Sequence, residues 1–135
     1  MTLGIKESKL IEFMEIVDER GSLVPLEGLK NIPFEIKRVY YIYNTKPDAP
    51  RGFHAMKNTE LVMICLYGSC DVILDDGKQK KNYHLNNKNQ GLFIDKMIWH
   101  EMHNLTEDCV LIVLTNDYYN EIDNLRDYQS FLKEL

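Results

Sequence analysis

The sequence is poor in cysteine: three occur in 135 residues, an odd number, and no two of them form a C-x-x-C pair. This count argues against a disulfide framework and against the paired thiols of common zinc motifs. Cys65, Cys70 and Cys109 lie in apolar or turn contexts. We therefore expect three reduced, mostly buried thiols in a cytoplasmic protein.

Long hydrophobic runs and an excess of positive charge are also missing. No apolar stretch approaches the length that crosses a membrane, and the first residues show no apolar signal-peptide core. The net charge of −5 argues against a general nucleic-acid binder, because such proteins need a basic surface. We expect neither a membrane nor a nucleic acid as a partner.

Most of the chain has the pattern of β-structure. It shows no internal repeat and no linker, so we expect one domain over residues 1–135. Short β-rich runs alternate with turn signals, as in an all-β sandwich or barrel. Residues 60–66 and 109–114 are apolar almost throughout, which predicts strands buried on both faces. Residues 10–26 predict a β-hairpin that precedes the barrel.

The C-terminal residues follow a different pattern. Asp117 stands at a plausible N-cap position before a run with helical periodicity. The apolar and aromatic residues at this spacing are Tyr118, Ile122, Leu125, Tyr128 and Leu132. We predict a C-terminal α-helix over about 117–133, with its tyrosines packed on the barrel.

Two stretches carry the residues that are suited to chemistry. The first, Arg51–Glu60, contains His54 and Met56, and the second, Trp99–Asn104, contains His100 and Met102. If both are strands, alternation places each histidine on the same face as the methionine two residues later. We expect these two faces to meet inside one barrel.

A third strand is expected to contribute to the same site. The run from Phe34 to Asn44 has the strongest β-propensity in the chain, because it is rich in tyrosine and valine. On this strand Arg38, Tyr40 and Ile42 share one face. Arg38 and Tyr40 are therefore candidates for the interior site.

The spacing of the first two stretches resembles the two sequence motifs of the cupin superfamily. His54-x-Met56-x-x-x-Glu60 corresponds to the first motif, and His100 lies in the second. The resemblance implies an all-β cupin jelly-roll barrel with one interior site. In a metal-binding cupin, His54, Glu60 and His100 would be ligands, together with the residue at 56. Methionine is a poor ligand for the divalent ions of such sites, so a metal-dependent enzyme is the alternative interpretation.

A closer resemblance covers nearly the whole chain. The strings that carry it are RVYYI at 38–42, PRGFHA at 50–55, GSC at 68–70, LDDG at 74–77, WHEM at 99–102 and DYY at 117–119. They look like the nucleotide-sugar 3,4-ketoisomerases, metal-free cupins that use no cofactor. The family converts dTDP-4-keto-6-deoxyglucose to its 3-keto isomer on the route to the 3-amino-3,6-dideoxy sugars of lipopolysaccharide O-antigens. The resemblance also implies a homodimer that exchanges N-terminal strands.

This reaction needs proton carriers, because it removes the C3 proton, passes through an enediol and protonates C4. Histidine suits that task near neutral pH. In the family, two histidines two residues apart flank the sugar, and they correspond to His54 and Met56. Because methionine cannot transfer a proton, the second carrier is expected to be Tyr40 or His100, unless His54 performs both transfers. A binding-only cupin that lost its chemistry at Met56 is a further alternative.

The diphosphate of the substrate requires cations. By resemblance, Arg38 and Arg51 would hold it, and the planar guanidinium group suits phosphate oxygens. The family's residues at positions 20 and 100 vary with the configuration produced at C4. The pair found here, Arg20 and His100, suggests the galacto product.

Overall fold

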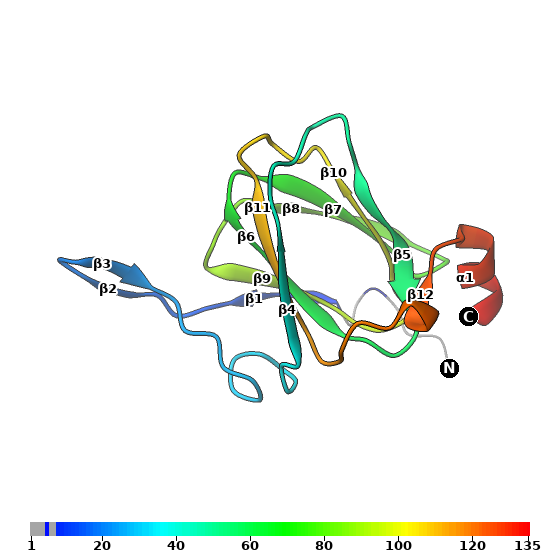
Figure 1. Cartoon of the computed structure of the whole chain (residues 1–135), viewed down its shortest axis with the longest axis horizontal. Coiled ribbons are helices and arrows are strands. Elements are labelled where there is room, and N and C mark those ends of the chain that lie inside the picture. The colour runs from blue at the N-terminus through cyan, green and yellow to red at the C-terminus, as the bar shows by residue number, and fades with distance from the viewer. Residues whose placement is uncertain (1–4, 6–7) are drawn as a thin grey trace.

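The computed structural model describes residue 5 and residues 8–135, and Figure 1 shows its arrangement. Strands account for most of the regular structure, and one short α-helix lies near the C-terminus. The strands are β1 (Lys9–Glu12), β2 (Ile16–Asp18), β3 (Gly21–Leu23), β4 (Arg38–Ile42), β5 (Arg51–Met56), β6 (Leu61–Tyr67), β7 (Cys70–Asp75), β8 (Lys80–Leu85), β9 (Gln90–Ile94), β10 (Trp99–His103), β11 (Val110–Thr115) and β12 (Asn124–Leu125). A 3₁₀ turn, η2 (Glu121–Asp123), precedes β12, and α1 (Tyr128–Glu134) follows it.

Two antiparallel sheets form the barrel. One has the strand order β1-β9-β6-β11-β4 and the other has the order β12-β5-β10-β7-β8. The strands β2 and β3 form a separate hairpin that projects from the barrel in Figure 1. The predicted all-β jelly-roll class is confirmed. The hairpin predicted over 10–26 is confined to residues 16–23, because Lys9–Glu12 pairs with β9 in the barrel instead. Residues 1–4 and 6–7 of the single domain expected over 1–135 lie outside the described residues.

The first sheet is covered on both faces. Inside the barrel, Met63 of β6 packs with Leu92 and Val113 in the main core. On the outer face, Val62 and Ile64 of the same strand pack in a second core. The N-terminal segment supplies the cover of that second core through Phe13, Ile32 and Phe34. This cover explains why β6 is apolar at successive positions, as the sequence predicted.

Gly91 in β9 allows the N-terminal segment to approach the sheet closely. A Cβ at this position would lie 2.8 Å from the ring of Phe13 and 2.7 Å from Val62. Both distances are well inside van der Waals contact, so a side chain there would push the cover away from the sheet.

The predicted helix over about 117–133 is wrong in its first half. Asn120 accepts a hydrogen bond from the Ile122 amide and caps η2, and the chain then pairs with β5 as β12. The helix begins only at Tyr128, after Asp127, whose side chain accepts from the Ser130 amide at 3.0 Å. The apolar periodicity predicted a helix face packed on the barrel, but Ile122, one of its positions, is 82% exposed.

The helix α1 packs against the sheet that contains β5 and β10. Phe131 is completely buried and packs with Ala55 of β5 and Trp99 of β10. Tyr128 lies edge-on to Trp99 and donates a hydrogen bond to Asp75 at 2.7 Å, as expected of a packing tyrosine. In contrast, Tyr118 and Tyr119 do not pack under the helix as expected, because they precede it and are largely exposed.

The three cysteines are buried and unbonded, as the sequence predicted. Cys65 and Cys109 lie next to each other inside the barrel, with their Sγ atoms 3.9 Å apart. Among the described residues, no helix has the length and apolar character needed to cross a membrane.

Candidate active site

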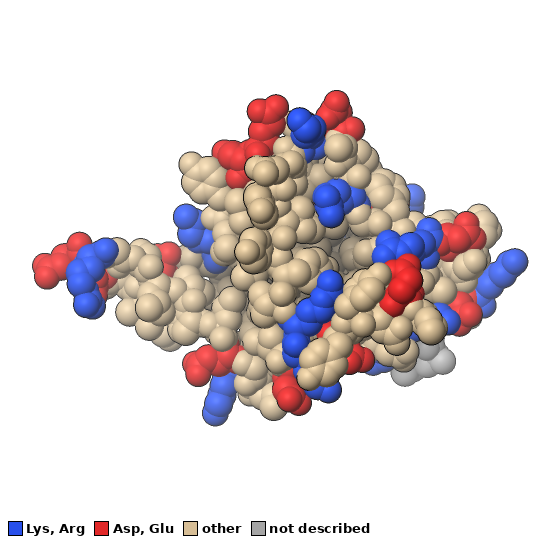
Figure 2. Space-filling view, viewed as in Figure 1, with Lys and Arg blue, Asp and Glu red and all other residues tan. Residues whose placement is uncertain are grey.

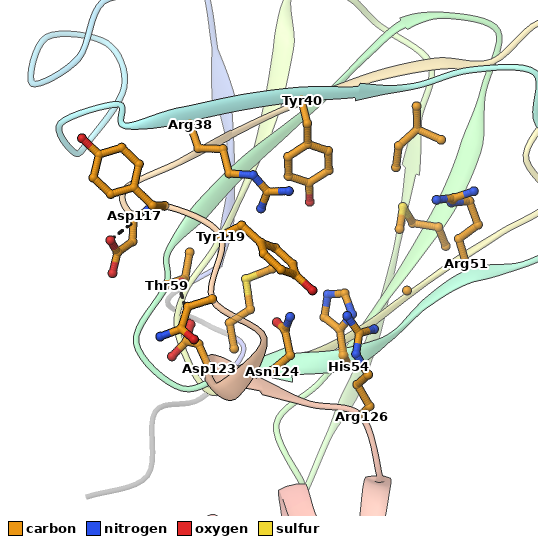
Figure 3. A pocket seen from close by; sticks show the side chains of 16 residues that line it. Arg38, Tyr40, Arg51, His54, Thr59, Asp117, Tyr119, Asp123, Asn124 and Arg126 are labelled. Atoms are coloured by element: carbon orange, nitrogen blue, oxygen red, sulfur yellow. Dashed lines mark hydrogen bonds between the residues drawn. The ribbon is translucent and has the colours of Figure 1, made fainter.

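A cavity of about 360 Å³ opens where β4 and β5 face the segment from Asp117 to Arg126. Figure 3 shows its walls from close by. Strand β4 contributes Arg38, Tyr40 and Ile42, and strand β5 contributes Arg51, Gly52, His54 and Met56. The C-terminal segment contributes Asp117, Tyr118, Tyr119, Asn120, Asp123, Asn124 and Arg126.

The face predicted for β4 is the one that lines the cavity. Residues 38, 40 and 42 are partly buried, whereas their neighbours Val39 and Tyr41 are exposed, as the period of two requires. The guanidinium of Arg38 lies over the ring of Tyr40 at 4.4 Å and over that of Tyr119 at 5.1 Å. These cation–π contacts orient Arg38 and leave its N–H groups available to a ligand.

Strand β5 is irregular at the point where it meets the cavity. In its pairing with β10, His54 is opposite His100 but Gly52 is opposite Glu101, so Phe53 is the extra residue of a β-bulge. Gly52 and Phe53 both have positive φ, and a Cβ on Gly52 would lie 3.0 Å from the His100 carbonyl oxygen. The bulge resets the alternation, so Arg51 and His54, three residues apart, both line the cavity.

His54 is the only histidine that lines this cavity in the described part of the chain. Both of its ring nitrogens are buried, and neither has a hydrogen-bond partner among the described residues. Burial, followed by the nearby charge of Arg126, lowers the pKa of His54 to about 4, while Glu121 opposes the shift. The ring is therefore neutral near pH 7, and its unprotonated nitrogen can accept a proton from a bound molecule.

Tyr40 faces the same cavity, and burial shifts its pKa upward, whereas it shifts that of His54 downward. Burial raises the pKa of its phenol, and the charges of Arg38 and Arg51 partly offset that effect. Tyr40 therefore keeps its proton near neutral pH. In Figure 3 its hydroxyl points into the cavity toward the side of His54, so an acid and a base face one space.

His100 lies behind His54 and does not line the cavity. Its side chain is buried, and its ring meets the ring of His54 edge-on with centroids 4.5 Å apart. Burial, followed by the His54 charge, lowers the pKa of His100 to about 3. This contact suits a residue that orients His54, while the place of His100 behind that ring gives it no direct access to a ligand.

The metal-ligand set of the alternative interpretation is not assembled. The side chain of Glu60 accepts a hydrogen bond from Asn116 at 3.1 Å and does not line the cavity with His54. Within the part of the chain that the structure describes, no three His, Cys, Asp or Glu side chains are grouped to hold a metal ion. Met56 does line the cavity, where it forms an apolar wall.

Arg20 is the one predicted site residue that lies far from this cavity. It occupies the turn between β2 and β3, exposed to solvent, and its guanidinium pairs with Asp18 at 2.6 Å. The hairpin projects away from β4 and β5 in Figure 1. The structure therefore brings together Arg38, Tyr40, Arg51, His54 and Met56, and leaves Arg20 outside.

The C-terminal segment supplies site residues that the sequence analysis missed. Asp123 is buried and anchors this segment to the chain that follows β5, since it accepts from the Asn58 amide at 2.8 Å and from the Thr59 hydroxyl at 2.5 Å. Arg126 adds a third guanidinium to the cavity. The capping pattern of Asn120 was the available signal, but the helical periodicity concealed it.

The cavity is suited to an anionic ligand although the protein is acidic. Arg38 and Arg51 have no carboxylate partner within 4 Å among the described residues, whereas Arg126 pairs with Glu121. Figure 2 shows Lys and Arg side chains at the border of the hollow on this face. The two unpaired guanidinium groups can hold phosphate oxygens, which leaves the neutral imidazole of His54 free to accept a proton.

Known proteins resemble this chain over nearly its whole length. Residues 6–135 match the model of the family described as FdtA: WxcM-like, C-terminal. The chain is 54% identical over 127 residues to a TDP-4-oxo-6-deoxy-alpha-D-glucose-3,4-oxoisomerase of Aneurinibacillus thermoaerophilus, which covers 94% of this chain and 91% of that protein.

Two solved structures are also similar. A 3,4-ketoisomerase from Helicobacter canadensis superposes with a TM-score of 0.93 at 52% identity and covers 95% of this chain and 96% of its own. A variant of the 3,4-ketoisomerase QdtA from Thermoanaerobacterium thermosaccharolyticum, in complex with TDP-4-keto-6-deoxyglucose, has a TM-score of 0.92 at 42% identity. That match covers 94% of this chain and 92% of the QdtA chain.

Proposed function

Because the chain belongs to the FdtA, WxcM-like family, we propose that it is a sugar-nucleotide 3,4-ketoisomerase. Its substrate is TDP-4-keto-6-deoxyglucose and its product is the 3-keto isomer. The observation that carries the proposal is His54, a neutral imidazole with two unpartnered nitrogens, in a cavity that also holds unpaired arginines. The isomerisation is redox-neutral, so proton carriers suffice and no cofactor is required.

His54 acts as the general base. One ring nitrogen takes the proton from C3 of the sugar, the C3–H electron pair forms a double bond to C4, and the C4 carbonyl oxygen becomes the enediolate oxygen. The proton of the C3 hydroxyl then passes to the C4 oxygen, a proton is delivered to C4, and C3 becomes the carbonyl carbon; the proton taken by His54 replaces the one delivered to C4. Atoms and electrons balance, because the product is an isomer of the substrate.

Tyr40 is the second proton carrier. Met56 lines the cavity at the position where the family has another histidine, and it carries no proton. The phenol of Tyr40 retains its proton because burial raises its pKa, and it faces the cavity from the strand opposite His54. Tyr40 therefore serves as the acid that delivers a proton to the sugar.

Arg38 and Arg51 hold the diphosphate. Neither has a carboxylate partner among the described residues, so no ion pair must be broken when phosphate binds. The ring of Tyr119, already against Arg38, offers an exposed aromatic face for the base of the nucleotide.

The proposed function is tested with the keto sugar itself. We expect purified protein to convert TDP-4-keto-6-deoxyglucose to a species that a 3-aminotransferase then aminates, detected by mass spectrometry. In heavy water, C3 should exchange its hydrogen for deuterium at a rate that depends on the protein. Absence of both exchange and amination, while TDP still binds, would instead identify a binding protein. An activity that follows bound iron or zinc would favour a metal-dependent enzyme.

The pH dependence of the reaction reports on His54. Because the base must be unprotonated, kcat/KM should be constant near neutral pH and fall as the pH drops through the pKa of His54, about 4. An exposed imidazole would place this fall near 6.5.

Below about 6.5 the unfolded chain binds more protons than the folded one at His54 and His100, so the free energy of unfolding decreases as the pH falls. Circular dichroism at each pH separates unfolding from titration, and a midpoint near 6.5 in folded protein would contradict a buried base.

We also propose a cytoplasmic homodimer that exchanges N-terminal strands. The β2–β3 hairpin forms its own two-stranded sheet and exposes Ile16, Val17 and Leu23, and Met14 just before it is also exposed. The outer face of β4 exposes Val39 and Tyr41, and Tyr43 just after the strand is exposed as well. A second copy would cover these apolar side chains and could bring Arg20 to its partner's cavity. Sedimentation velocity should give twice the mass of one chain, and a monomer would contradict the exchange.

The galacto configuration at C4 is the proposed outcome of the reaction. It is supported by the residue types at the two positions that, by the family resemblance, vary with configuration, arginine at 20 and histidine at 100. Proton NMR of the product would show an axial C4 hydroxyl, and an equatorial hydroxyl would identify the gluco product.

A further inference from the structure

The carboxylate of Glu121 connects three side chains at the mouth of the cavity. It accepts hydrogen bonds from Arg126 Nε at 2.5 Å and Nη2 at 2.9 Å, from the Tyr119 hydroxyl at 2.5 Å and from Asn124 Nδ2 at 3.3 Å. All three donors line the cavity, whereas Glu121 does not. The hydrogen bonds from Arg126 and Tyr119 lower the pKa of Glu121 to about 2, so the carboxylate is ionised.

These hydrogen bonds contribute little to the stability of the fold. The side chains of Arg126 and Glu121 are each about half exposed, and exposed ion pairs contribute little to folding. The two parallel hydrogen bonds do, however, fix the plane and direction of the Arg126 guanidinium. A cation held in one orientation at the mouth of the cavity can stabilise negative charge that develops on a bound molecule.

The strand register places Arg126 beside the proposed base. In the pairing of β12 with β5, Asn124 is opposite Met56 and Leu125 is opposite Ala55. Continuing this antiparallel register by one residue sets Arg126 against His54. In Figure 3 the guanidinium lies next to the imidazole, and its charge is one cause of the low pKa of His54.

The proposed reaction develops negative charge close to this position. When His54 removes the C3 proton, the C4 oxygen acquires the charge of the enediolate. A preoriented cation stabilises such charge without reorganising during the reaction. Arg126 Nη1 has no hydrogen-bond partner among the described residues and is available for that oxygen.

Arg126 differs from the other two arginines in a way that separates their roles. Arg38 and Arg51 have no carboxylate partner and can give their whole charge to a diphosphate. Arg126 is partly neutralised by Glu121, which weakens it as a phosphate ligand but keeps it in one orientation.

We propose that Arg126 is a catalytic residue that donates a hydrogen bond to the enediolate oxygen, and that Glu121 is the positioning residue that holds it there. The inference rests on the proposed isomerase function. In the step concerned, His54 takes the C3 proton, the C3–H electron pair forms the C3=C4 bond, and the C4 oxygen receives the carbonyl π electrons while Arg126 donates to it. Arg126 keeps all its protons.

Substitution of Arg126 separates this role from phosphate binding. We expect Arg126→Met to lower kcat and the C3 deuterium exchange rate by about 10²- to 10³-fold, the loss typical of one oxyanion donor. The Kd of TDP, measured by calorimetry, should change less than about twofold because the diphosphate is held elsewhere. Arg126→Lys should restore part of kcat. Lys133→Met, which removes an exposed cation from α1, is the matched control and should match the wild type.

Glu121→Gln tests the positioning role. We expect kcat to fall about tenfold, because Arg126 loses its bidentate partner. The acid midpoint of kcat/KM should shift downward, since Glu121 no longer offsets the charge of Arg126 on His54. Arg126→Met should shift it upward. A purely structural role would give neither of these opposite shifts.

Two outcomes would overturn the inference and leave the proposed function standing. In the first, the wild type isomerises the sugar and Arg126→Met is as fast. In the second, Arg126→Met raises KM and the Kd of TDP together at unchanged kcat, which would make Arg126 a phosphate ligand. A wild-type protein that binds TDP without exchanging C3 hydrogen would instead refute the proposed function.

Discussion

Replacing His54 with asparagine should lower kcat by about 10³-fold or more, toward the upper end of the range for loss of a general base. Asparagine has a similar size and polarity, but its amide cannot accept the C3 proton. The cavity should persist, because His54 makes no hydrogen bond with a described residue that the substitution would break. Deuterium exchange at C3 in heavy water measures the step directly, since it requires only proton removal.

Met56 provides the matched comparison for His54. It lines the same cavity two residues later on β5. The resemblance found in the sequence implies a histidine at this position. Met56→His should keep or raise kcat, because it adds a second imidazole beside the sugar. The Kd of TDP should be the same in His54→Asn and Met56→His as in the wild type. Equal exchange rates for the wild type and His54→Asn would remove His54 from its role as base.

Phe131→Ala should destabilise the fold by about 3–5 kcal/mol, the usual cost of removing a buried phenylalanine from a tight core. Phe131 is completely buried, and its ring centroid lies 5.8 Å from that of Trp99. Its other neighbours include Ala55, next to His54 in β5. The lost packing therefore loosens α1 from the sheet that carries the proposed base. Urea denaturation followed by circular dichroism measures the change.

Ile122→Ala is the control for this effect. Ile122 is also a large apolar residue of the C-terminal region, but it is 82% exposed and should change stability by less than about 0.5 kcal/mol. If Phe131→Ala were equally mild, α1 would not be part of the cooperative core. In that case kcat should also be insensitive to the substitution.

The sequence predicted the proposed base and one wall of the site because both depend on local patterns. The alternation along β4 places Arg38 and Tyr40 on one face, and the structure has them there. The spacing around His54 and His100 predicted a barrel in which the two strands meet, and the two rings are in contact. A period of two needs only that the chain be extended, so neighbouring residues suffice to establish it.

The C-terminal segment was beyond the reach of the same reasoning. Its helical periodicity is real in the sequence, but residues 120–126 instead form η2 and β12 against β5. The pairing of Asn124 with Met56 joins residues far apart in the chain, and no local pattern encodes it. Arg126 was missed as a site residue for that reason.

The sequence by itself determined the all-β barrel and the buried thiols, and its resemblance to the nucleotide-sugar 3,4-ketoisomerases predicted the activity that similar proteins carry. Only the tertiary structure decided which cations share a space with His54. Regular alternation would place Arg51, three residues before His54, on the opposite face, but pairing with β10 creates a bulge at Phe53 that brings both into one cavity. The low pKa of His54 has the same origin, because burial and the charge of Arg126 arise from packing between distant segments.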